Sequence, residues 1–116
     1  MSDYTIYHNP RCSKSRSTLA LLEDNGVTPA VVLYLETGPD AAEIGGLLEK
    51  LGKRAAQVVR RGEAEYKASG LDADSSEDDI IAAMVSYPKL IERPIVVHGG
   101  RAVLGRPPEN VLELIG

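Results

Sequence analysis

The chain has 116 residues, a single cysteine and a formal net charge of -4. A chain of this length can bury a core without metal ions, one cysteine cannot form an internal disulfide, and basic residues that form no stripe argue against general nucleic-acid binding. The opening MSDYTIYHNP lacks a basic segment followed by an apolar run, and no stretch approaches the ~20 apolar residues of a membrane span, so we expect a soluble cytoplasmic protein.

The first third of the sequence predicts a βαβ unit. Residues 4–7 have the composition of a strand, which the following proline ends. Residues 13–24 predict a helix that stops at Asn25-Gly26. The β-branched run at 30–35 predicts a buried strand. The two strands should be parallel and joined by a right-handed crossover.

The middle of the chain, about 38–88, predicts a helical insertion. Its apolar residues follow helical spacing, and its polar residues include good helix caps. Three helices are expected: one that starts at Pro39 and stops at Gly52, a short one near 54–60, and one that is capped by Ser75 or Ser76 and ends at Tyr87-Pro88.

The last quarter predicts a hairpin and a closing helix. Two short apolar runs flank Gly99-Gly100, a pair suited to a two-residue turn, and PPENVLELI at 107–115 starts a helix with proline. The order βαβ, helical insertion, ββα is that of a single α/β domain over 1–116 with a thioredoxin-like fold. Such a fold has a crevice at the carboxyl end of its first strand, which is where Cys12 falls.

Cys12 lies in surroundings that favour a thiolate. A lone cysteine is most often a buried, inert residue, but 8–17 contains no aliphatic side chain. The start of the predicted helix offers free N–H groups and the positive end of its dipole. Arg11, Lys14 and Arg16 add positive charge, so we expect a thiol pKa below the usual value of about 8.5. The sequence therefore predicts a nucleophile beside an anion site.

Other polar residues near the thiol each have more than one reading. The Ser15 hydroxyl could bond the sulfur or be an ordinary first-turn serine. His8 could tune the thiolate, act as a base or lie solvated at the strand end, whereas His98 is interpreted as structural or solvated. Ser15 makes the motif C-x-x-S and not a dithiol, and Thr18 stands where a phosphatase-like loop needs arginine. Two histidines with one cysteine predict no metal site.

The spacing of three arginines does not by itself indicate a binding site. Arg60, Arg93 and Arg106 are scattered over separate segments, and an isolated arginine is usually solvated. A cis bond at Arg93-Pro94 would turn the backbone into the crevice, an interpretation that rests on fold analogy.

Six segments in sequence order resemble one family. They are IYHNPRCSKSR at 6–16, LYLE at 33–36, LLEKLG at 47–52, VVRRGEAEYKASGL at 58–71, LIERPIVV at 90–97 and VLGRPPENVLEL at 103–114. Together they cover essentially the whole chain. The sequence they form resembles the glutaredoxin-dependent arsenate reductases, a thioredoxin-fold group with a helical insertion.

The resemblance implies roles for individual residues. Cys12 would be the nucleophile, Arg60, Arg93 and Arg106 would clamp the oxyanion, and His8 matches the family motif with its role open. Ser15 and Arg16 are further candidates for tuning the thiolate. The implied substrate is arsenate, with glutathione as cosubstrate, glutaredoxin as partner and no tightly bound cofactor. Reduction of As(V) to As(III) takes two electrons, so one protein thiol needs external thiols to be restored.

Two other functions stay open from the sequence. Spx-type regulators share the fold and part of the motifs and bind RNA polymerase; many carry a C-x-x-C redox switch, against which Ser15 argues. A glutathione-dependent thiol reductase with another substrate is the third hypothesis, and its turnover would be insensitive to arsenate.

Overall fold

The computed structural model describes residues 3–115, which divide into two compact units. The sheet unit comprises the described residues up to Thr37 and those from Arg93 onward. The helical unit comprises Gly38–Glu92. The insertion predicted at about 38–88 thus falls within the helical unit, which extends four residues beyond the predicted end.

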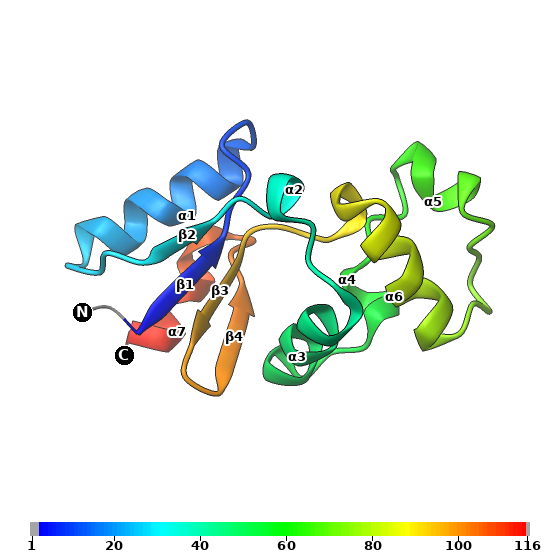
Figure 1. Ribbon diagram of the computed structural model, residues 1–116. Helices are drawn as coiled ribbons and strands as arrows, with labels where there is room; N and C mark the ends of the chain where they lie inside the picture. The colour runs from blue at the N-terminus through cyan, green and yellow to red at the C-terminus, as the bar shows by residue number, and fades with distance from the viewer. Residues whose placement is uncertain (1–2, 116) are drawn as a thin grey trace. The chain divides into compact units, whose positions relative to one another are not determined.

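The sheet unit holds a four-stranded mixed sheet of order β2-β1-β3-β4. β1 pairs in parallel with β2 and antiparallel with β3, which pairs antiparallel with β4 (Figure 1). This arrangement confirms the predicted βαβ–ββα order of a thioredoxin-like fold. The strands are β1 (Tyr4–Tyr7), β2 (Ala30–Val32), β3 (Ile95–His98) and β4 (Arg101–Leu104).

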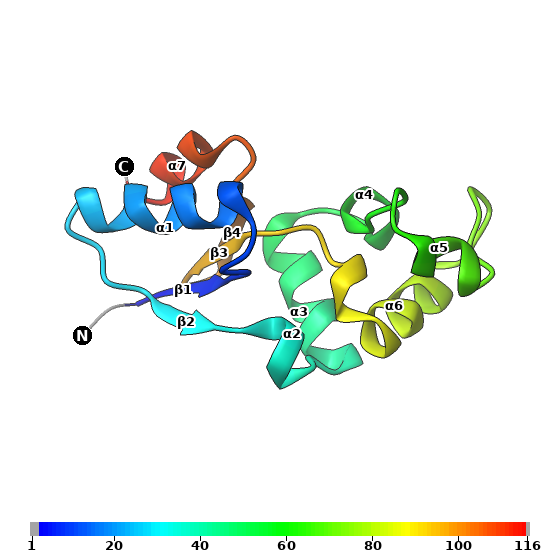
Figure 2. The same ribbon diagram turned by 90° about the horizontal axis from the view of Figure 1, so that it is seen from above.

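Helices cover one face of this sheet. Figure 2 shows α1 and α7 on the same face, and the short 3₁₀ segment η2 packs against both α1 and β4. The core between these layers is aliphatic and is formed by Ile6, Leu22, Val96, Val111 and Leu114. The helical elements are α1 (Ser13–Asp24), α2 (Tyr34–Thr37), η2 (Pro108–Val111) and α7 (Leu112–Ile115).

The bounds predicted for α1 are confirmed. Val27 donates its N–H to the Leu22 carbonyl, and Gly26 takes a φ of 78°, a left-handed conformation that glycine adopts without a steric penalty. The closing helix is also confirmed, but its first turn is 3₁₀ and only 112–115 is α-helical.

The prediction of a buried strand over 30–35 is wrong in two respects. The strand ends at Val32, and α2 begins at Tyr34, where Glu36 and Thr37 donate their N–H groups to the Leu33 carbonyl. β2 is also an edge strand, and Val31 is 47% exposed. An apolar run does not reveal how many neighbours a strand will have, since that depends on the order of strands in the sheet.

The helical unit is built around α6, which packs against α3, α4 and η1. Its buried side chains are mostly aliphatic, and they include Ile44, Leu47, Val58, Ile80 and Met84. The elements are α3 (Ala41–Leu51), α4 (Ala55–Val58), α5 (Ala64–Ala68), α6 (Glu77–Ser86) and η1 (Pro88–Leu90).

Cap residues explain where these helices begin. Ser76 accepts the Asp79 N–H at 3.1 Å, which selects Ser76 over Ser75 as the cap of α6. Asp40 caps α3 by accepting the Glu43 N–H at 2.8 Å. Pro39 therefore precedes the cap, and its predicted place at the first helical position is wrong because the Asp40 carboxylate takes the cap one residue later. The α5 helix was not predicted from the sequence.

Gly105 lies at a close contact of separate segments in the sheet unit. Its N–H donates to the Pro94 carbonyl at 2.9 Å, and its own carbonyl accepts the Thr18 hydroxyl at 3.1 Å. A Cβ atom at this position would lie 2.6 Å from Thr18 Oγ1 and 2.8 Å from Pro94 Cγ. Thr18 is fully buried, so α1 and the two loops meet with no room for a side chain.

We expect Gly105→Ala to lower the free energy of unfolding by about 1–3 kcal/mol, because the added methyl group must displace backbone or buried atoms. Urea denaturation of wild type and variant measures this loss. Gly100→Ala is the control, since a Cβ there meets nothing within 4 Å, and its effect should stay within about 0.5 kcal/mol. Equal stability of Gly105→Ala and wild type would contradict the packing argument.

Candidate functional site

Cys12 is the N-cap residue of α1, as the sequence predicted. Its backbone is extended, with φ -96° and ψ 123°, and its carbonyl accepts the Arg16 N–H at 3.0 Å. Its own N–H donates to the Asn9 carbonyl at 3.0 Å, which closes the loop before the helix. The thiol is free and half-buried. The sulfur therefore lies at the positive end of a 12-residue helix.

The pKa of the Cys12 thiol lies below its ordinary value. Partial burial is the largest influence and raises the pKa, because it disfavours the thiolate. The Ser15 N–H and the Arg93 charge act next, and both lower the pKa. The Lys14 N–H and the Arg106 charge lower it further. The combined stabilisation outweighs burial, and the thiolate fraction at neutral pH rises.

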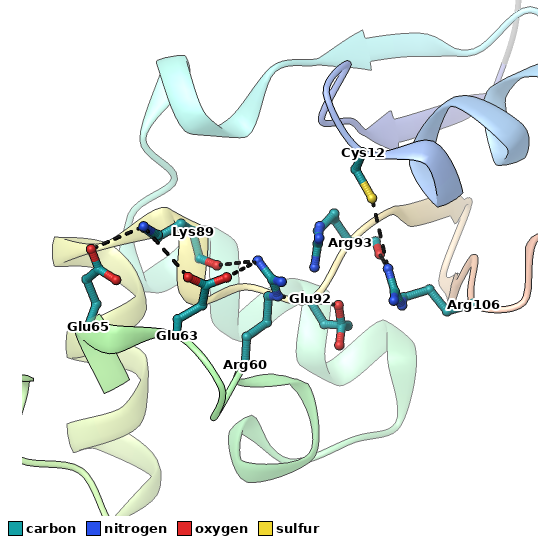
Figure 3. A network of polar contacts seen from close by, with 8 residues as sticks. All are labelled: Cys12, Arg60, Glu63, Glu65, Lys89, Glu92, Arg93 and Arg106. Atoms are coloured by element: carbon teal, nitrogen blue, oxygen red, sulfur yellow. Dashed lines mark hydrogen bonds and ion pairs between the residues drawn. The ribbon is translucent and has the colours of Figure 1, made fainter. Parts of the chain in front are cut away.

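The two arginines whose charges lower the pKa of the thiol come from loops on either side of the hairpin. Arg93 precedes β3 and Arg106 follows β4. The Arg106 Nη1 lies 4.0 Å from the Cys12 sulfur and 3.4 Å from the Arg93 carbonyl oxygen (Figure 3). The Arg93-Pro94 bond, whose isomer the sequence left open, is cis, and the Arg106-Pro107 bond is cis as well, which the sequence analysis did not anticipate.

The Gly105 contact connects these three parts of the site. Thr18 belongs to the helix that Cys12 caps, and Gly105 directly precedes Arg106. The hydrogen bonds of Gly105 to Thr18 and Pro94 tie the helix to both arginine-bearing loops. The backbone from which each arginine extends is therefore held next to the helix that carries Cys12.

His8 and Ser15 form a buried polar pair beneath the loop. His8 is 6% exposed and Ser15 is fully buried, and the His8 Nδ1 lies 2.6 Å from the Ser15 hydroxyl oxygen. That oxygen also accepts the Asn9 N–H at 3.0 Å. Burial lowers the pKa of His8, and the Arg16 charge lowers it further, so the imidazole is neutral at neutral pH.

These contacts exclude one of the readings left open for each residue. A solvated His8 is wrong, because its ring is buried against Ser15. The Ser15 group that lowers the pKa of the thiol is its backbone N–H, while its hydroxyl bonds His8 and the Asn9 N–H. Ser15 thus orients the loop with its side chain and stabilises the thiolate with its main chain.

The source of the positive charge differs from the sequence-based expectation. The Arg16 guanidinium donates to the Pro10 carbonyl at 2.8 Å and thus secures the loop. Lys14 lowers the thiol pKa through its backbone N–H, and the charges that lower it belong to Arg93 and Arg106. The predicted direction of the shift is confirmed, whereas the predicted charges are not its source.

Arg60 belongs to the helical unit and is held there by carboxylates. Its Nη1 lies 2.8 Å from Glu63 Oε1, and its Nε lies 3.9 Å from Glu92 Oε1. Its backbone N–H donates to the Leu90 carbonyl at 2.7 Å. Lys89 extends the network through Glu63, as Figure 3 shows. Of the predicted site residues, the sheet unit thus brings together Cys12, Arg93 and Arg106, and Arg60 lies in the other unit.

The remaining candidate residue, His98, packs against an aromatic side chain. His98 stacks on Tyr4, with ring centroids 4.0 Å apart, in agreement with its structural reading.

Within residues 3–115, no group of three or more His, Cys, Asp or Glu side chains converges in a way that could hold a metal ion. No helix over the same residues is both long and apolar enough to cross a membrane.

Comparisons with known proteins show the family to which the chain belongs. The model of the ArsC family matches residues 7–114. The chain belongs to the ArsC family. It is 58% identical to the uncharacterized protein YfgD of Escherichia coli K12, over 96% of this chain and 95% of the relative. It is 46% identical to an arsenate reductase of Haemophilus influenzae, over 95% of this chain and 97% of the relative. The solved structure of an arsenate reductase from Vibrio cholerae has 53% identity and a TM-score of 0.91, and the alignment covers 95% of each chain.

We expect Arg106→Gln and Arg93→Gln each to raise the pKa of the Cys12 thiol, because each removes a positive charge that stabilises the thiolate. The pH dependence of alkylation by iodoacetamide measures the midpoint. Below that midpoint both variants should react more slowly than wild type. Arg101→Gln, an exposed arginine at the start of β4, is the control and should leave the profile unchanged. Identical midpoints in all four proteins would contradict the assignment.

Proposed function

We propose that this protein is an arsenate reductase that uses Cys12 as its nucleophile. The observation that carries the proposal is the contact of the Arg106 guanidinium with a thiol of lowered pKa at the start of α1. A thiolate and two arginines in one place suit an anionic, electrophilic substrate. The arsenate reductases among the relatives of this ArsC-family chain support the same activity.

The arginines bind and polarise the substrate in this mechanism. A guanidinium group is planar, stays charged and bonds a tetrahedral oxyanion through two parallel N–H groups. Arg93 and Arg106 take this role in the sheet unit, and the family motif adds Arg60. The Cys12 sulfur attacks arsenic, an S–As bond forms, and one arsenic oxygen leaves as hydroxide or water. The guanidinium groups stabilise the charge on the remaining oxygens.

The electrons come from external thiols, for which we propose glutathione and glutaredoxin. Glutathione adds its sulfur to the arsenic of the Cys12 adduct and displaces a second oxygen. A glutaredoxin thiol then attacks the glutathione sulfur, so a disulfide forms and the electron pair of the broken S–As bond reduces As(V) to As(III). Hydrolysis releases arsenite and restores the Cys12 thiol. Both donors are kept reduced in the cytoplasm, where we expect the protein to act.

We expect arsenate-dependent NADPH oxidation in an assay that contains glutathione, glutathione reductase and glutaredoxin, and its loss to background in Cys12→Ser, because the variant lacks the nucleophile. A Cys12→Ser protein with the wild-type melting temperature confirms that the loss is chemical. If the wild-type protein reduces a disulfide substrate but not arsenate, the protein is a thiol reductase with another substrate. Binding to RNA polymerase without turnover would instead indicate the Spx-type function.

We expect phosphate to inhibit competitively against arsenate without being consumed. It matches arsenate in shape and charge, so the same guanidinium groups bind it, but thiols do not reduce it. Initial rates at several phosphate concentrations give the type of inhibition, and phosphate analysis before and after turnover tests consumption. Noncompetitive inhibition would contradict a shared site on the arginines.

A further inference from the structure

The loop that carries Arg106 is held by a side chain from the segment that follows it. Asn110 lies in η2 and is half-buried. Its side-chain Nδ2 donates to the Leu104 carbonyl at 3.1 Å and to the Arg106 carbonyl at 3.2 Å. Because both partners are acceptors, the nitrogen of this amide and not its oxygen has to face the loop. Asn110 therefore supplies donors that an apolar residue of similar shape lacks.

The backbone before Arg106 depends on such restraint. Gly105 lies between the two carbonyls, and its own carbonyl accepts the Thr18 hydroxyl at 3.1 Å, so three successive carbonyls accept hydrogen bonds from side chains. Glycine restricts the backbone less than any other residue, and a loop with glycine at this position needs restraint from its surroundings. The flanking carbonyls converge on one nitrogen, which restrains the backbone torsions of Gly105 and Arg106 between them.

The element that carries Asn110 is itself anchored in the core. η2 packs against α1 and β4, and Val111, the next residue, is fully buried in the aliphatic core of the sheet unit. The Asn110 N–H donates to the Pro107 carbonyl at 3.1 Å, which closes the turn between the loop and η2. A donor on an anchored backbone can hold a loop in place, whereas a donor on a mobile segment would move with the loop.

The Arg106 guanidinium is the part of this loop that approaches the thiol. Its Nη1 lies 4.0 Å from the Cys12 sulfur and 3.4 Å from the Arg93 carbonyl oxygen. We propose that Asn110 is a positioning residue, whose side-chain amide orients the backbone from which Arg106 extends toward the Cys12 sulfur and the arsenate oxygens. The inference rests on the proposed function as far as arsenate is concerned, whereas the effect on the thiol needs no substrate.

The pH dependence of Cys12 alkylation by iodoacetamide tests the positioning without turnover. We expect Asn110→Leu, which keeps the branched shape and removes the donors, to raise the midpoint, because the Arg106 charge that lowers the thiol pKa is no longer held beside the sulfur. Asn110→Ala should act in the same direction and replaces Asn110→Leu if that variant does not fold. Asn25→Ala is the matched control, since Asn25 donates its side-chain N–H to the Leu21 carbonyl at 2.8 Å at the other end of α1. It removes a hydrogen bond of the same kind and should leave the midpoint unchanged.

A double-mutant cycle with Arg106→Gln separates positioning from a general loosening of the fold. If Asn110 acts through Arg106, Asn110→Leu should raise the midpoint when Arg106 is present and leave it unchanged in the Arg106→Gln background. An unchanged midpoint in Asn110→Leu with Arg106 present overturns the inference. An equal shift in both backgrounds also overturns it, because Asn110 would then act on the thiol by another route.

Steady-state kinetics give the second readout. The kcat/KM for arsenate should fall about tenfold in Asn110→Leu, which is the worth of one weakened hydrogen bond to a charged group. An unchanged kcat/KM would contradict the role of Asn110 toward arsenate. A midpoint shift that depends on Arg106, in a protein that does not reduce arsenate, would uphold the positioning of Arg106 at the thiol and refute the proposed reaction. Arsenate turnover without any midpoint shift would do the reverse, so the two failures are distinct.

Discussion

The close contact at Gly105 is the constraint on which the site depends. Its hydrogen bonds join α1 to the loop before β3 and to the loop after β4, and the space for a side chain is already filled by Thr18 and Pro94. The thiol and its arginines lie on the outer ends of these same three segments. The backbone positions from which Cys12 and the two arginines extend are therefore held together by a residue that carries none of these groups.

Electrostatics at Cys12 reflect a balance between burial and local stabilisation. Burial opposes the thiolate, while helix N–H groups and two arginines favour it. The arginines that stabilise the thiolate are also those that would bind the oxyanion, so nucleophile and substrate share the same positive charge. The helix N–H groups lower the pKa of the thiol independently of the arginines. They keep the thiolate stabilised when an anion engages the guanidinium groups.

The buried pair of His8 and Ser15 gives the loop its rigidity. Burying two polar side chains is unfavourable unless they are hydrogen-bonded, and here the hydroxyl is bonded to the imidazole and to the Asn9 N–H. These hydrogen bonds therefore tie the loop backbone at Asn9 to the first turn of α1. The loop carries Cys12, and its residues His8 to Arg11 also line a cavity of the sheet unit.

The sequence by itself determined the local structure and the nucleophile. Helix stops, caps and the Gly-Gly turn act over a few residues, which is why α1, α3, α6 and the hairpin were predicted, and the polar stretch around Cys12 indicated a thiol of lowered pKa. Tertiary structure decided what depends on distant segments. It made β2 an edge strand, placed Arg93 and Arg106 at the sulfur, and buried His8 against Ser15. Spacing along the chain gave no sign of these contacts, because the arginines lie more than 80 residues from Cys12 in sequence and are brought to it by sheet pairing and by the packing at Gly105.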